Sequence, residues 1–144
     1  VAFWRPTGKH MQNLPELLEK YPNLYFDLSL GTRQILVDGM HVMAKHKKLF
    51  QDFINKYAKR LVVGSDMVLT RNREKTIGWM TKILIAMRQQ FETQRFRFDL
   101  ASAYSKYYKK GTDQDGYIDG LALHANTLEQ IYLSTPQKLL GFAH

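Results

Sequence analysis

Short β-prone apolar runs alternate along this chain with longer segments of helical periodicity. The apolar runs cover residues 1–4, 24–28 and 61–63. The clearest helical segment, residues 77–91, has apolar residues at three- and four-residue steps, which form a single stripe. Buried strands joined by helices are typical of βαβ units, whose strands are parallel. The alternation therefore predicts an α/β fold with three parallel strands in sequence order and helices packed outside them.

Three further helical segments are expected. The first fits residues 14–20, with Asn13 as its N-cap. The second covers residues 33–57 and is broken at Gly39, because glycine is a poor helix former. The last spans residues 127–133. The sequence contains no repeat and no low-complexity tract, so we expect residues 1–144 to form one domain.

The net charge of +8 raises the question of nucleic-acid binding, and its distribution matters. Residues 71–110 carry ten Lys and Arg against three acidic residues, whereas residues 111–144 carry one Lys against four. The basic residues are spread along a long helix and its successor instead of forming the compact cluster that is typical of nucleic-acid patches. We interpret them as a solvated helix face, and nucleic acid is not an expected partner.

Two other features of the composition limit the function. The chain has no cysteine, so disulfides, thiolate metal sites and a cysteine nucleophile are excluded. It has no apolar run long enough to span a membrane and no signal-peptide pattern. The expected location is the cytoplasm.

Polar residues stand at the ends of the second and third expected strands. Asp27 and Ser29 lie at the end of one strand, and Ser65 and Asp66 follow the other. In parallel β/α folds the functional groups lie at the C-terminal ends of the strands. The sequence therefore predicts a site in which these side chains meet.

Four segments, in order and spacing, resemble the amidohydrolase family, which includes the amidohydrolase-related decarboxylases. They are residues 17–29 (LLEKYPNLYFDLS), 60–66 (RLVVGSD), 128–132 (LEQIY) and 138–142 (KLLGF). In that family the first segment corresponds to helix six and strand seven, the second to strand eight, and the others to the closing helix. The resemblance implies a partial (β/α)₈ TIM barrel, roughly its last three β/α units, with residues 67–120 as an inserted helical segment.

The resemblance also implies a metal site. Family members hold one or two divalent metals, commonly zinc, at the C-terminal face of the barrel. Asp66 corresponds to their aspartate after strand eight, which ligates the metal and accepts a proton from the metal-bound water. We expect Asp27 and Ser29, at the end of the neighbouring strand, to contact a small-molecule substrate.

The ligand set is incomplete in this sequence. It has no His-x-His pair, and Pro6-Thr7-Gly8 stands where the family often has His-x-Gly. His10 is a weak substitute, and a catalytic zinc generally has three protein ligands. The chain opens on Val1 instead of Met, which we interpret as a processed or partial sequence. We expect the missing N-terminal half of the barrel, or a second copy of the chain, as a partner.

The predicted function is therefore that of part of a metal-dependent hydrolase, in which activated water attacks an amide or ester bond. The chain alone is expected to be inactive. A non-oxidative decarboxylase of the same family is one alternative. A non-enzymatic domain that binds nucleic acid or an acidic partner is another, and its best candidate residues are Tyr104, Tyr107, Tyr108, Lys106, Lys109 and Lys110.

Two other motifs carry less weight. Residues 113–119 resemble the middle of a calcium-binding loop, but its first and last ligand positions fall on Gly111 and Ala122. An acidic turn is the simpler interpretation. His41 and His46 are five residues apart, which does not place both on one metal, so we interpret them as surface histidines.

Overall fold

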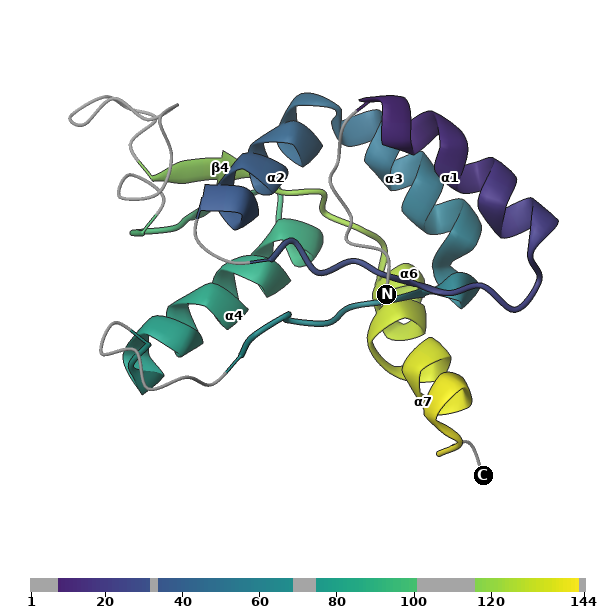
Figure 1. Ribbon diagram of the computed structural model, residues 1–144. Coiled ribbons are helices and arrows are strands. Elements are labelled where there is room, and N and C mark those ends of the chain that lie inside the picture. Colours follow the sequence, from purple (N-terminus) through teal and green to yellow (C-terminus); the bar gives the residue numbers. More distant parts are fainter. Residues whose placement is uncertain (1–7, 32–33, 69–74, 101–115, 143–144) are drawn as a thin grey trace.

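The computed structural model describes residues 8–31, 34–68, 75–100 and 116–142 (Figure 1). At residues 8–10, 12 and 34 only the backbone is described. The expected first strand, residues 1–4, lies outside these ranges. The tyrosine-rich segment, residues 104–110, and the first part of the acidic turn, residues 113–115, also lie outside them.

The described chain has an α/β fold that is mostly helical, with two small sheets. In chain order the elements are α1 (Gly8–Lys20), β1 (Phe26–Asp27), α2 (Gln34–Lys45), α3 (Lys47–Tyr57), the short helix η1 (Ala58–Arg60), β2 (Leu61–Val62), α4 (Ile77–Glu92), β3 (Arg95–Arg97), β4 (Tyr117–Asp119), α6 (Ala125–Glu129), the π-helical turn η2 (Gln130–Ser134) and α7 (Thr135–Leu140).

The parallel pairing expected of the second and third strands is confirmed. β1 pairs with β2 in parallel, with Phe26 opposite Leu61 and Asp27 opposite Val62. The N–H of Leu28 also donates to the carbonyl of Val62 at 2.8 Å, which extends the pairing by one residue. The strands are shorter than predicted, and α2 and α3 form the connection between them.

The second sheet was not expected. β3 and β4 are antiparallel, with Phe96 opposite Ile118. Both residues are buried, and the residues that flank them on each strand are exposed. The segment 67–120 therefore contains the expected long helix, α4, and also a two-stranded sheet.

The expected break at Gly39 is wrong, because α2 continues through this residue and ends at Lys45. A Cβ built on Gly39 would lie 3.1 Å from Cδ2 of Leu30. Glycine thus allows α2 to pack closely on the segment that follows β1. The helical break lies instead at His46, between α2 and α3.

Two helices are longer than predicted. α1 begins at Gly8, well before Asn13, and includes Pro15. At the other end of the chain, α6, η2 and α7 form one helical stretch, which begins after His124 and ends at Gly141. Its last turn extends away from the body of the molecule (Figure 1).

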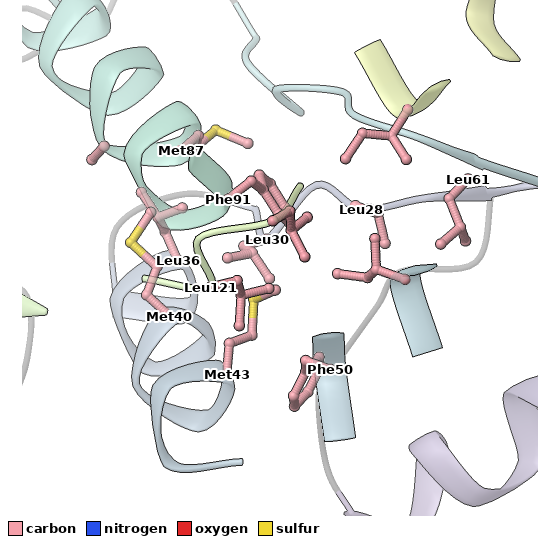
Figure 2. Close-up of a cluster of buried hydrophobic side chains, with 14 of the residues drawn as sticks. Leu28, Leu30, Leu36, Met40, Met43, Phe50, Leu61, Met87, Phe91 and Leu121 are labelled. Carbon is pink, nitrogen blue, oxygen red and sulfur yellow. The ribbon is translucent and has the colours of Figure 1, made fainter. Parts of the chain in front are cut away.

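One hydrophobic core joins the segments around both sheets (Figure 2). It includes Leu28 and Leu30 after β1, Met40 from α2, Phe91 from α4 and Leu121 after β4, all almost fully buried. Burying one such side chain contributes about 1.5–3 kcal/mol. The core therefore fixes the segment after β1, which carries part of the candidate site, against α2 and α4.

Candidate functional site

The candidate site lies at the C-terminal edge of the β1–β2 pair. Because the strands are parallel, the segments that leave them, residues 28–31 and 63–68, emerge at the same edge. Leu28 and Leu30 are buried and hold the first segment in the core. The polar residues expected to meet are thus brought to neighbouring strand ends.

The carboxylate of Asp27 bonds to the backbone of both segments. Its Oδ1 atom accepts the N–H of Ser29 at 2.7 Å and the N–H of Gly64 at 2.9 Å. The first bond closes a turn directly after β1, and the second crosses to the residue that follows Val63. The α-carbon of Gly64 also lies close to the second oxygen of this carboxylate, since a Cβ built on Gly64 would lie 2.3 Å from Oδ2 of Asp27.

Asp66 has an exposed side chain and a positive φ of 47°. Its Oδ2 lies 3.8 Å from a Cβ built on Gly31, so the carboxylate stands over the chain that leaves β1. Gly31 is buried and also has a positive φ, 76°. The backbone of both residues is therefore in a region that glycine and, among other residues, Asp and Asn adopt most readily.

The two serines have local roles in the geometry. Ser29 is buried, and its N–H is the one bonded to Asp27. Oγ of Ser65 accepts the N–H of Met67 at 3.3 Å, which supports the turn around Asp66. Of the four predicted polar residues, Asp66 therefore presents the exposed carboxylate. Asp27 and Ser65 accept backbone N–H groups, and the N–H of Ser29 donates to Asp27.

Sequence reasoning missed Arg60, which stands directly before β2. Its Nε donates to the carbonyl of Leu24 at 2.7 Å, and its Nη2 donates to the carbonyl of Tyr21 at 2.6 Å. The guanidinium also lies over the ring of Tyr25, 5.3 Å from its centroid. Arg60 thus fastens the loop that enters β1 to the start of β2, and no local sequence signal indicates these distant carbonyls.

Among the predicted site residues, one exposed carboxylate is a candidate metal ligand. Within the described residues, no group of three or more His, Asp or Glu side chains is placed to hold a metal ion. Asp66 fits the role of a single ligand, since its carboxylate is exposed. The side chain of His10 lies outside the described residues.

The basic residues of α4 lie on its solvent face. Arg88 is exposed and forms an ion pair with Glu92 one turn later, at 2.9 Å. Lys82 is also exposed and lies 3.9 Å from Asp99. Their charges are therefore partly balanced by neighbouring carboxylates, as the interpretation of a solvated face requires.

Comparison with models of protein families, with curated proteins and with solved structures finds no match for this chain. None of the helices in the described ranges is long and apolar enough to cross a membrane.

Proposed function

We propose that this chain is part of a metal-dependent hydrolase with an amidohydrolase-type (β/α)₈ barrel. The observation that carries the proposal is the position of Asp66, four residues after the end of β2, a strand that pairs in parallel with β1. Its carboxylate is exposed at the edge where such barrels place their functional groups. The order of the four family-like segments supports the reaction class.

In this function Asp66 would be one ligand of a divalent metal, zinc by the chemistry of the family, in a site that other segments complete. When bound, such a metal would supply an activated water and polarise the carbonyl of a small-molecule amide or ester. Asp66 would accept a proton from that water, a role that its exposed carboxylate allows. Oγ of Ser65 supports the turn around this carboxylate by accepting the N–H of Met67.

The remaining ligands would come from the N-terminal half of the barrel, and a second copy of the chain is the alternative partner for the open strand edge. In the two-stranded sheet, β1 and β2 each have one partner among the described residues. Each strand therefore has an edge at which a further strand can pair. A neighbour there would also bring its own strand end to the edge that carries Asp66.

The experiment starts from the DNA that encodes this chain. The upstream reading frame is examined for a segment with His-x-His after a β-prone run, and that segment is produced together with residues 1–144. We expect zinc at a fixed ratio to protein, and hydrolysis of amide or ester substrates.

The test variant is Asp66→Asn, because asparagine tolerates the positive φ and removes the charge. It should lower turnover by on the order of a hundredfold, a typical contribution of a positioned base. Asp52→Asn, at an exposed carboxylate on α3, is the matched control and should keep full activity. Full turnover by Asp66→Asn would contradict the proposal, and release of CO₂ in place of hydrolysis would indicate the decarboxylase.

A further inference from the structure

The contacts of Asp27 give it a structural role at the ends of both strands. One of its oxygens, Oδ1, already accepts two backbone N–H groups, from Ser29 and Gly64. These two donors belong to different strand ends, and Gly64 is 37 residues after Asp27 in the sequence. Hydrogen bonds in which a carboxylate is the acceptor are stronger than bonds between neutral groups.

The second oxygen has little room for another partner on the side of Gly64. A Cβ built on Gly64 would meet Oδ2 at 2.3 Å and Oδ1 at 2.8 Å, distances at which one of the groups would have to move. Asp27 and Gly64 are therefore a matched pair, since the carboxylate occupies the space that any side chain at residue 64 would need.

Gly64 lies two residues before Asp66. Fixing the N–H of Gly64 fixes the start of the turn whose next residues are Ser65 and Asp66, and Oγ of Ser65 then bonds to the N–H of Met67. The result of this turn is that the carboxylate of Asp66 stands over Gly31, on the segment that leaves β1. The bond to Ser29 holds that segment from its own strand end.

We propose that Asp27 is a positioning residue that joins the ends of β1 and β2 through Oδ1 and so orients the side chain of Asp66. The catalytic importance of this orientation rests on the proposed function, but the positioning role does not. The positioning role requires an oxygen acceptor at Oδ1 but does not require a negative charge. A role in binding a cationic or metal-bound substrate would require the charge.

The test compares Asp27→Asn and Asp27→Ala in the 144-residue chain by NMR. An asparagine oxygen can accept both N–H groups, so Asp27→Asn should keep the slow hydrogen exchange of the Ser29 and Gly64 amides. Asp27→Ala should accelerate both by on the order of tenfold, the usual effect of losing a bond to a charged acceptor. Asp52→Ala, which removes an exposed carboxylate on α3, should change neither.

A second NMR measurement reports the position of the Asp66 side chain. Cross-relaxation between the β-protons of Asp66 and the α-protons of Gly31 should persist in Asp27→Asn and disappear in Asp27→Ala. Contacts between Phe26 and Leu61, inside the strand pair, should remain in both variants. Retention of the Asp66–Gly31 contact in Asp27→Ala would overturn the proposal, and so would loss of amide protection in Asp27→Asn. If Asp27→Ala does not fold, Asp27→Asn alone decides by the same criteria.

Activity separates this proposal from the proposed function. In the assembled hydrolase, Asp27→Asn should retain turnover and Asp27→Ala should lose it. The NMR results can be as expected while the assembled protein has no hydrolase activity. That outcome would support the positioning role and contradict the hydrolase function.

Discussion

Ala122 holds a backbone conformation that glycine adopts with less strain. Its φ is 47°, in the left-handed region, and its N–H donates to the carbonyl of Thr93 at 3.1 Å. The left-handed conformation costs a residue with a Cβ about 1 kcal/mol. We expect Ala122→Gly to raise the free energy of unfolding by up to about 1 kcal/mol, measured by urea denaturation. Ala86→Gly, inside α4, should lower it by at least about 1 kcal/mol, because Ala86 is also buried, and a loss of stability in Ala122→Gly would contradict this account.

The interpretation of His41 as a surface histidine is wrong, because the structure half-buries it in α2, and this burial gives the chain a pH dependence near neutrality. Burial lowers the pKa of its imidazole, and the nearby Asp38 carboxylate opposes this effect only in part. In the unfolded chain the imidazole binds a proton below about pH 6.5, whereas the folded chain disfavours that proton. The unfolded state therefore binds more protons in this range, and the free energy of unfolding should fall as the pH drops below about 6.5.

The measurement for His41 is urea denaturation between about pH 7.5 and about pH 5.5. His41→Gln should flatten the slope, and His46→Gln, at the exposed turn before α3, should leave it unchanged. Glu19 does not interfere, because bonds from the Tyr57 hydroxyl and from Lys56 lower its pKa. The stability that this carboxylate contributes is lost only below its ordinary value of 4.5. An unchanged slope in His41→Gln would remove His41 as the cause.

The position of Asp66 could be predicted from the sequence, whereas the contacts of Asp27 could not. Asp66 follows a β-branched run and a glycine, and a parallel strand end is a local feature of the sequence. Asp27 stands at a strand end too, but its second bond reaches Gly64 across the sheet. A contact between residues so far apart depends on strand register, which local patterns do not determine.

At the scale of elements, the chain after β4 completes the end of α4. The N–H groups of residues 121–123 donate to the carbonyls of Gln90, Thr93 and Phe91, respectively, at 2.7–3.1 Å. Helix ends otherwise leave their last carbonyls without partners. The approach is close at Gly120, where a Cβ would lie 2.3 Å from the carbonyl oxygen of Thr93.

This approach predicts a large effect of Gly120→Ala. The added methyl would meet backbone atoms, which cannot rotate away, so we expect a loss of about 3 kcal/mol in the free energy of unfolding. Gly141→Ala is the control, because a Cβ there meets nothing within 4 Å and only the positive φ of 76° opposes it. The control should cost about 1 kcal/mol. Equal effects in thermal or urea denaturation would contradict the close approach.

The differences between predicted and observed elements have local physical causes. β3 and β4 have three residues each, too few for a period of two to be recognised, and Phe96 and Ile118 are their only core residues. Gly39 was interpreted as a break because glycine is a poor helix former, yet its small size is what lets α2 approach Leu30. Tertiary packing overrides propensity at this position.

At the scale of the whole molecule, the alternation of strands and helices predicted the α/β class and the parallel pair. These features follow from periodicity, which is a property of each segment by itself. The barrel and its metal site depend on further strands and on ligands that the described residues do not bring together. They therefore remain predictions that rest on the family resemblance.

The last prediction concerns the 144-residue chain by itself, which should hold no complete catalytic metal site and show no hydrolase activity. A catalytic zinc generally has three protein ligands. Among the described residues Asp66 presents a suitable carboxylate, whereas Oδ1 of Asp27 already bonds to Ser29 and Gly64. The purified chain is equilibrated with zinc, dialysed, and assayed for metal content and for amide and ester hydrolysis. Stoichiometric zinc that Asp66→Asn abolishes, together with measurable hydrolysis, would show that His10 or another residue completes the site.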